Sequence, residues 1–430
     1  MGIFAFMFIT LFFLLFLGVP VGISMLGTAI AMLAFLRGIG NIPAEMIAQR
    51  MVYGVDNFIL LAIPAFLLIG KLMNGAGITD RIFNVALAFF GHFRGGLGHV
   101  NIVASMIFAG MSGSAVADAG GLGAVELKAM KDDGYPEDFS LAVTAASSTV
   151  GPIIPPSIPA VIYGALANAS ITRIFIGSIV PGFIMGALMM VVVFIIAHKK
   201  GFSVHPKKPF RQRLGIIYRG ILPLLTPFII IGGILTGIFT PTEASAVALF
   251  YCVCISFFIF RSITLREFAG IIRDTMYDTA VILFIIASSS MYSWVLARYQ
   301  VASGFVAFLA AEVSSPWVLL LLINLFLLLI GCFIDATPAL FLLTPMLMPL
   351  IQKYGIDPVH FGVMMVLNLM IGLVTPPVGT VLYTLEKVSG VPFMHITKAM
   401  LPFYIPLFLS LIIITAFPQT VLWLPDILIG

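Results

Sequence analysis

Charged residues are scarce in this sequence. Asp, Glu, Lys and Arg make up 9% of the 430 residues, whereas soluble proteins carry about 25%. Hydrophobic residues make up 61%, and they fall in long continuous runs rather than in the ~10-residue alternating segments of a membrane β-barrel. Uncharged runs such as the first 36 residues are long enough for a helix to span a bilayer. We therefore expect an all-α polytopic membrane protein.

Motifs that carry chemistry are also few. The three cysteines, an odd number, lie in apolar runs without a histidine cluster, which argues against a disulfide framework or a metal site. No Gly-x-x-x-x-Gly-Lys-Ser/Thr or His-Glu-x-x-His sequence occurs, so the chain has neither a P-loop nor that zinc motif. The net charge of +4 comes from basic residues beside the apolar runs. We expect no nucleic-acid partner and no enzymatic activity.

The N-terminus lacks the features of a signal peptide. It has no basic n-region and no clear cleavage site, so we interpret the first 36 residues as membrane-spanning. Pro20 divides this stretch, and the pattern fits either one kinked helix or two shorter ones. Whether this stretch crosses the membrane once or twice determines on which side of the membrane the later segments lie.

One stretch cannot be regular helix although it lies in an uncharged run from Phe139 to Thr172. Residues 151–159 read Gly-Pro-Ile-Ile-Pro-Pro-Ser-Ile-Pro, and prolines remove amide donors and clash with the preceding turn. Irregular backbone at membrane depth is tolerated only where protein buries it or where it lines a polar cavity. We predict a broken helix over about 138–168, with one half ending near Thr149 and the other starting near Pro156.

A second break of the same kind lies in the uncharged run from Pro358 to Leu385. Residues 372–379 read Gly-Leu-Val-Thr-Pro-Pro-Val-Gly, and they predict a broken helix over about 358–389. Interrupted helices in corresponding positions of two halves are the best sequence indication of the binding site of a secondary transporter.

A polar turn between two helices precedes each break. The turns are residues 112–121 and 331–339, and we interpret them as the tips of re-entrant hairpins over about 98–132 and 316–353. Carbonyl oxygens at helix C-termini suit a sodium ion, and amide groups at helix N-termini suit a carboxylate. The alternative is that Ser112, Ser114 and Thr337 merely cap buried helix ends.

The two halves of the chain repeat each other weakly. A shift of 221 residues superimposes helix breakers, for example Gly110 on Gly331 and Pro155 on Pro376. Residues 198–219 hold seven of the 22 Lys and Arg and no acid, which predicts a basic cytoplasmic linker. We therefore predict a first repeat, 1–197, and a second, 220–430, related by inversion because the second ends without a basic residue.

Asp335 is the strongest candidate for chemistry. It lies between the uncharged runs 313–334 and 336–352, and a carboxylate at membrane depth is a functional hypothesis by default. It could bind a cation, relay a proton or hold the substrate; the alternative is a cap on the second helix of the hairpin. Asp118 has the same two interpretations.

Two other charged residues have structural explanations. Glu243 follows Thr240-Pro241-Thr242, and this order predicts a helix-capping box. Lys71 lies at the end of a predicted span, where snorkelling of its long side chain to the membrane surface accounts for its charge.

Four motifs, in this order along the chain, resemble the large membrane (M) subunit of tripartite ATP-independent periplasmic (TRAP) transporters. The resemblance covers the whole chain and comes nearest to the sialic-acid branch. The four are Gly110-Met111-Ser112-Gly113-Ser114-Ala115, Gly151-Pro152-Ile153-Ile154-Pro155-Pro156-Ser157, Gly237-Ile238-Phe239-Thr240-Pro241-Thr242-Glu243-Ala244 and Thr375-Pro376-Pro377-Val378-Gly379.

The resemblance implies a fold, a location and partners. The family has the ion-transporter-superfamily fold, in which a transport domain moves as an elevator against a scaffold. It lies in the bacterial cytoplasmic (inner) membrane and imports organic acids with Na⁺ as the coupling ion. A periplasmic substrate-binding (P) protein delivers the substrate, and a small four-helix membrane (Q) subunit braces the large one.

The resemblance also implies site residues. The first sodium site takes Gly110, Ser112, Gly151 and Pro155, and the second takes Gly331, Gly372, Thr375 and Pro376. The substrate lies between the two tips, near Ser114, Ser157, Asp335 and Thr337. The halves differ chemically, because the 221-residue shift places Asp335 opposite Ser114 and Thr375 opposite Ile154.

The sequence thus predicts a sodium-coupled importer of an anionic organic acid, with sialic acid as the first candidate. The alternatives are a C4-dicarboxylate or another carboxylate as substrate, proton coupling through Asp335, and a passive channel. An intramembrane enzyme using Asp335 and Asp118 is a further rival. Substrate identity, sodium stoichiometry, oligomeric state and the docking surface of the binding protein stay open at this stage.

Overall fold

The computed structural model describes residues 2–202, 209–299, 313 and 315–429. Every regular element in these residues is a helix, which confirms the expectation of an all-α chain. The predicted basic linker is described only in part, because residues 203–208, with Lys207 and Lys208, lie outside the described residues.

The N-terminal stretch forms two helices rather than one. α1 (Gly2–Phe16) and α2 (Val21–Arg37) are separated by Gly18, with a left-handed φ of +79°, and by Pro20. A left-handed residue followed by proline cannot continue a helix. The chain then forms a 3₁₀ turn (Ile39–Asn41), α3 (Ala44–Val55), a second 3₁₀ turn (Phe58–Leu61), α4 (Ala62–Gly75) and α5 (Ile78–Phe90).

The next elements contain the first interruption. The helical conformation is lost between Ser148 and Ile158, and a preceding helix folds back so that α8 packs on α6 and α9. The elements are α6 (Gly96–Ser112), α7 (Ala115–Gly120), α8 (Leu122–Asp132), α9 (Glu137–Ser148), α10 (Ile158–Ala167) and α11 (Ile171–Lys200).

Three long elements follow: α12 (Phe210–Leu235), α13 (Pro241–Cys254) with a π-helical turn (Ile255–Ile259), and α14 (Leu265–Arg298). The predicted capping box at the start of α13 is confirmed. The Thr240 amide donates to Glu243 Oε2 at 2.8 Å, and the Glu243 amide donates to Thr240 Oγ1 at 3.3 Å. Glu243 therefore satisfies the first turn of a helix.

The last elements contain the second interruption, between Gly372 and Thr380. They are α16 (Pro316–Gly331), α17 (Ala336–Lys353), α18 (Pro358–Gly372), α19 (Thr380–Ser389), α20 (Phe393–Ala399), α21 (Leu401–Ala416) and α22 (Gln419–Leu428).

Several helices are long and apolar enough to cross a membrane. In the described ranges these are Phe58–Gly75, Ile171–Lys200, Pro241–Ile259 and Leu265–Arg298, and α20 with α21 forms a fifth candidate bent by 61°. Others are too short to span alone: α10 has 10 residues, or about 15 Å at 1.5 Å per residue, against a hydrocarbon core of about 30 Å. The lengths and composition of these helices indicate a multi-pass membrane protein that also contains apolar helices too short to span on their own.

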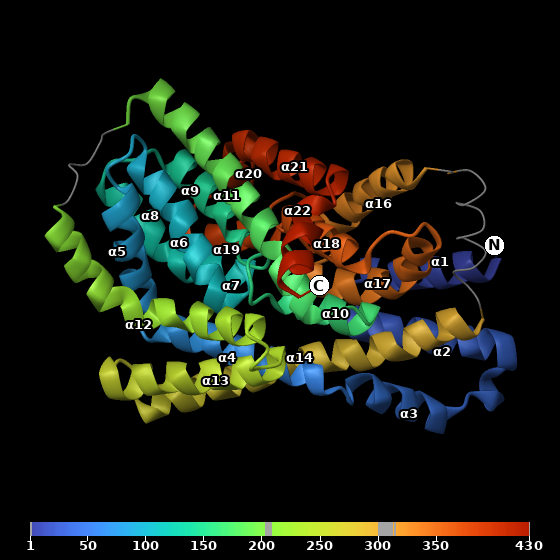
Figure 1. The fold of residues 1–430 in the computed structure, drawn as a ribbon. Coiled ribbons are helices and arrows are strands. Elements are labelled where there is room, and N and C mark those ends of the chain that lie inside the picture. The colour runs from blue at the N-terminus through green and yellow to red at the C-terminus, as the bar shows by residue number, and fades with distance from the viewer. Residues whose placement is uncertain (1, 203–208, 300–312, 314, 430) are drawn as a thin grey trace.

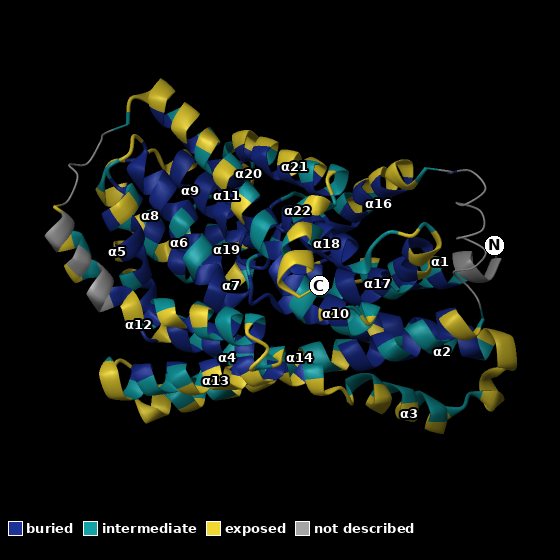
Figure 2. Ribbon diagram, viewed as in Figure 1, coloured by how far each residue is buried: buried dark blue, intermediate teal, exposed yellow. Residues whose placement is uncertain are grey.

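The helices lie in two layers (Figure 1). The long-helix layer, at the bottom of the view, comprises α2, α4, α12, α13 and α14. The hairpin layer above it comprises α6–α10 and α16–α19. Figure 2 shows that the hairpin layer is the more buried: in α18, for example, every residue from Val359 to Gly372 is buried. Helices from both halves of the chain make up each layer.

Tyr163 joins the two interrupted helices within the hairpin layer. Its buried hydroxyl, on α10, donates to the Pro358 carbonyl at the start of α18 at 2.7 Å. Gly362 lies one turn further along α18, and a Cβ there would be 2.2 Å from the Tyr163 ring. The ring therefore fills the space above the glycine, and α10 packs directly on α18.

Replacing Tyr163 with phenylalanine is expected to lower the free energy of unfolding by about 0.5–1.5 kcal/mol, the net value of one hydrogen bond. The measurement is thermal unfolding of the purified protein in detergent. Tyr53, which is 72% exposed, provides the control Tyr53→Phe. Equal unfolding midpoints for the two variants would show that the Tyr163 hydroxyl contributes nothing.

Candidate functional site

The first interruption is held together by its own serine. Ser157 caps α10 by accepting a hydrogen bond from the Ala160 amide at 3.1 Å, and its hydroxyl donates to the Pro152 carbonyl. The Pro155–Pro156 bond within this stretch is cis. The Ser157 side chain is fully buried, and its hydroxyl is engaged with the backbone on both sides.

The first hairpin tip lies against this interruption. α6 ends at Ser112, Gly113 is left-handed with φ +56°, and Ser114 caps α7 by accepting from the Ala117 amide at 3.4 Å. A Cβ at Gly113 would lie 2.8 Å from the Pro156 carbonyl oxygen. A side chain at the tip would therefore push the backbone of the interruption away.

Three of the residues predicted for the first sodium site border one region. A Cβ at Gly110 would lie 3.7 Å from the Pro155 carbonyl oxygen, and one at Gly151 would lie 3.7 Å from the Ser114 carbonyl oxygen. Backbone of the tip and backbone of the interruption thus pack directly against each other at these two glycines. Ser112 is buried, and its Cα lies 3.2 Å from the Cβ position of Gly70 on α4.

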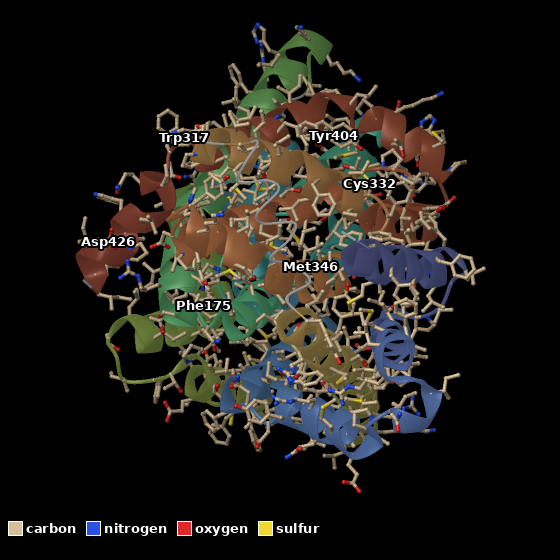
Figure 3. All side chains as sticks on the ribbon, turned by 90° about the vertical axis from the view of Figure 1, so that its right-hand side faces the viewer. Phe175, Trp317, Cys332, Met346, Tyr404 and Asp426 are labelled. Atoms are coloured by element: carbon tan, nitrogen blue, oxygen red, sulfur yellow. The ribbon has the colours of Figure 1, made fainter. Side chains whose placement is uncertain are left out.

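The second tip and the second interruption are in closer contact. A Cβ at Gly372 would lie 2.6 Å from the carbonyl carbon and oxygen of Gly331. The Val378 amide donates to the Cys332 carbonyl at 3.1 Å. Figure 3 labels Cys332 at this tip and Tyr404 on α21, and Tyr404 donates from its hydroxyl to the Val374 carbonyl at 2.6 Å.

Two further residues of the predicted second sodium site lie within the same interruption. Thr375 donates from Oγ1 to the Ile371 carbonyl at 2.7 Å, so its side chain satisfies a carbonyl in the last turn of α18. Pro376 follows it, and the Pro376–Pro377 bond is cis. The structure thus brings Gly331 and Gly372 into contact and places Thr375 and Pro376 in the adjoining loop.

A cavity of about 510 Å³ opens between the two tips. Ser114 and Pro152 line it from the first half of the chain, and Asp335 and Thr337 line it from the second. Three of the four predicted substrate residues therefore share one cavity. The fourth, Ser157, does not line it, because its hydroxyl is turned to the backbone of the interruption.

Asp335 places a carboxyl group at this cavity. It occupies the N-cap position of α17, but its side chain makes no capping hydrogen bond. Its Oδ1 accepts from Thr380 Oγ1 at 3.4 Å, and the residue is exposed. The Asp335 carboxylate thus lies both at the N-terminus of α17 and at the wall of the cavity, where a ligand can reach it.

Asp118 lies elsewhere. It belongs to α7 and is 1% exposed. α8 begins after Gly121 without a side-chain cap, so Asp118 does not cap that helix. Asp118 does not line the cavity between the tips, and the structure does not bring it to Asp335.

The third wall of the cavity comes from the long-helix layer, which the sequence analysis did not place there. α14 contributes five residues at helical spacing, and α4 contributes Leu67; the five are Tyr277, Asp278, Val281, Ile282 and Ile285. Lys71, one turn after Leu67, forms an ion pair with Asp278 at 2.5 Å. Lys71 therefore points to a partner within the protein, and snorkelling is not needed to explain it.

Polar side chains also join each hairpin to its interrupted helix. In the first half, Asn101 of α6 donates to Thr144 of α9 at 2.8 Å. In the second half, Asn368 of α18 donates to Asn324 of α16 at 2.8 Å. The sequence analysis did not single out these asparagines, because an isolated amide in an apolar run has no partner until the helices are placed.

The donor set defines the chemistry of the site. The described residues contain no group of three or more His, Cys, Asp or Glu side chains that could hold a metal ion. The tips offer backbone carbonyls and hydroxyls, which are ligands for hard cations. The helix N-termini at Ile158 and Ala336 border the cavity and favour an anion. The arrangement suits binding of an alkali cation together with an organic anion.

Comparison with protein families gives one match over most of the chain. Residues 8–420 match the family described as "Tripartite ATP-independent periplasmic transporter, DctM component". The matched range contains both interruptions, both tips and the cavity between them.

Three curated relatives align over most of this chain. The sialic acid TRAP transporter large permease protein SiaM of Vibrio cholerae is 46% identical, covering 97% of each chain. The sialic acid TRAP transporter permease protein SiaT of Haemophilus influenzae is 42% identical, covering 97% of this chain and 67% of its own. The C4-dicarboxylate TRAP transporter large permease protein DctM of Pseudomonas aeruginosa is 37% identical, covering 86% and 87%.

A solved structure shares the fold. The YdaH transporter of Alcanivorax borkumensis superimposes with a TM-score of 0.60, covering 87% of each chain, at 16% sequence identity. At that identity the likeness concerns the fold alone.

Proposed function

This chain belongs to the DctM component family of tripartite ATP-independent periplasmic transporters, and on that premise we propose that it imports an anionic organic acid by sodium symport, with sialic acid as the first candidate substrate. It is a transporter permease and not an enzyme. The observation that carries the proposal is the cavity between the two tips, which Ser114, Asp335 and Thr337 line together.

The sodium ions are assigned to the contacts between tips and interruptions. The first ion would be held near Gly110, Ser112, Gly151 and Pro155, and the second near Gly331, Gly372, Thr375 and Pro376. Support comes from the approach of Gly110 to the Pro155 carbonyl and of Gly372 to the Gly331 carbonyl. Backbone carbonyls do not titrate in the physiological range, so such sites favour sodium over protons as the coupling ion.

The anion is assigned to the cavity. Its carboxylate would face the helix N-termini at Ile158 and Ala336, and its hydroxyl or amide groups would bond to Asp335, Ser114 and Thr337. The V. cholerae and H. influenzae relatives, both described as sialic acid transporters, favour sialic acid. The P. aeruginosa relative, described as a C4-dicarboxylate transporter, makes a dicarboxylate the second candidate.

The transport motion is assigned to a displacement of the hairpin layer relative to the long-helix layer. We infer an inverted repeat, because α9 begins at residue 137 and α18 at residue 358, a difference of 358 − 137 = 221 that equals the sequence offset. The hairpin layer would move as the transport domain against the long-helix layer as scaffold. A small membrane subunit and a periplasmic binding protein would complete the transporter in the cytoplasmic membrane.

Uptake into proteoliposomes tests the proposed function. The vesicles contain this chain with its small subunit, the binding protein is added outside, and labelled sialic acid is the substrate. We expect accumulation with an inward sodium gradient and none with potassium at equal strength. Accumulation of succinate but not sialic acid would change the substrate and keep the mechanism. Equal equilibration in both salts would indicate a passive pathway and contradict the proposal.

A further inference from the structure

The cavity between the tips has an unbalanced charge. Among the described residues that line it, Asp278 and Asp335 are acidic and none is Lys or Arg. An anion that enters such a cavity meets two carboxylates, and the repulsion is stronger there than in bulk water because the protein interior has a lower effective dielectric constant. A positive charge at the cavity wall, in addition to the sodium ions proposed at the tips, would offset this repulsion.

Lys71 is placed to supply that cation. It follows Leu67 by one turn of α4, and residues four apart share one face of a helix. Leu67 lines the cavity, so Lys71 stands on the same face at its edge. The ammonium contacts Asp278 Oδ2 at 2.5 Å, and Asp278 is itself a lining residue. The Lys71 ammonium thus directly contacts a residue that lines the cavity.

The pair is also accessible. The side chains of Lys71 and Asp278 are 32% and 44% exposed, so solvent reaches both of them. A lysine side chain is a compact charge on a flexible four-carbon stem and can turn between neighbouring acceptors. The α4 and α14 helices that carry the two residues pack against each other, which keeps the pair at one place on the wall.

We propose that Lys71 is the counter-charge for the carboxylate of the transported anion and that Asp278 holds its ammonium at the cavity wall until the anion arrives. The inference deepens the proposed function and rests on it. When the anion binds, Lys71 exchanges one carboxylate for another, so its charge is paired both before and after. Asp278 keeps the partly exposed ammonium paired and in place while the cavity is empty.

The test uses direct binding, because the periplasmic binding protein has a specificity of its own. The purified complex of this chain with its small subunit is titrated with sialic acid in sodium chloride by calorimetry. Four variants are compared with the unchanged protein: Lys71→Gln, Asp278→Asn, the double variant and Lys71→Arg. Lys398→Gln, which removes an exposed cation on α20, is the matched control. Gel filtration and thermal unfolding verify that each variant is folded.

The expected pattern distinguishes a Lys71 that binds the substrate from a Lys71 that only links α4 to α14. Lys71→Gln raises the Kd about tenfold or more, and the double variant is equally weak because the cation is still missing. Asp278→Asn binds as well as the unchanged protein or more tightly, since it frees the ammonium. Lys71→Arg keeps most of the affinity. The methyl ester of sialic acid, which lacks the charge, binds equally to the unchanged protein and to Lys71→Gln.

Other patterns overturn the inference. If both single variants are weak and the double variant recovers, the ion pair is a structural link between α4 and α14. If Lys71→Gln binds sialic acid like Lys398→Gln, the helix N-termini alone hold the carboxylate. If the unchanged complex binds neither sialic acid nor succinate, the proposed function fails instead, which separates the two results.

Discussion

Replacing Asp335 with asparagine is expected to reduce the initial rate of sodium-driven uptake by about 10- to 100-fold. The change keeps the size of the side chain and removes its charge at the cavity between the tips. A hydrogen bond to a charged group contributes about 1.5–3 kcal/mol, and each 1.4 kcal/mol is a factor of ten. Asparagine is as good a helix N-cap as aspartate, so α17 keeps its N-cap residue in the variant and folding should not depend on the charge.

The measurement is uptake of labelled substrate into proteoliposomes, with the amount of inserted protein determined for each variant. Asp132→Asn, at the exposed end of α8, is the control for loss of one acidic charge. If Asp335→Asn takes up substrate within twofold of that control, Asp335 is not a binding residue. A variant that has lost uptake but also unfolds at a lower temperature would be assigned to stability instead.

Replacing Gly372 with alanine is expected to abolish uptake and to destabilise the protein by about 1–3 kcal/mol, the usual effect of overpacking. The added methyl group would lie 2.6 Å from the carbonyl carbon and oxygen of Gly331. Backbone cannot move aside as a flexible side chain does, so the second tip must shift from the interruption. The predicted sodium ligands Thr375 and Pro376 lie in the loop that would move.

Two further glycine-to-alanine variants test whether the effect follows the closeness of the contact. Gly331→Ala places its methyl group 3.3 Å from the Gly372 Cα, so its effect on uptake should be smaller than that of Gly372→Ala. Gly232→Ala on α12 has no atom within 4 Å of its Cβ position, and alanine favours helix over glycine; it should be neutral or slightly stabilising. Equal uptake by all three variants would show that the contact between tip and interruption is not required.

Local chemistry made part of this architecture predictable. Proline removes an amide donor wherever it occurs, so the interruptions could be placed at residues 151–159 and 372–379 without knowing any contact. The capping box at Thr240 and Glu243 was predictable for the same reason, because both partners lie within one turn. Charge-free runs predicted a polytopic membrane protein, and the match to a transporter family together with the all-helical fold of the described residues supports this.

The rest depended on contacts between distant segments. The pair of Lys71 and Asp278 joins α4 to α14 across 207 positions, 278 − 71, and neither residue signals its partner in the sequence. Ser157 illustrates the opposite case. A hydroxyl next to a predicted binding loop suggested a ligand, but the folded backbone uses it to cap α10 and to bond to Pro152. Whether a hydroxyl is buried can be determined only when the folded conformation of the loop is known.

The contact of Tyr163 with Gly362 has a consequence for how such sequences diverge. The ring belongs to the first half of the chain and the glycine to the second, yet they share one volume. A substitution that enlarges residue 362 is expected to require a smaller residue at 163. We therefore expect these two positions, one in each half of the chain, to vary together among related sequences.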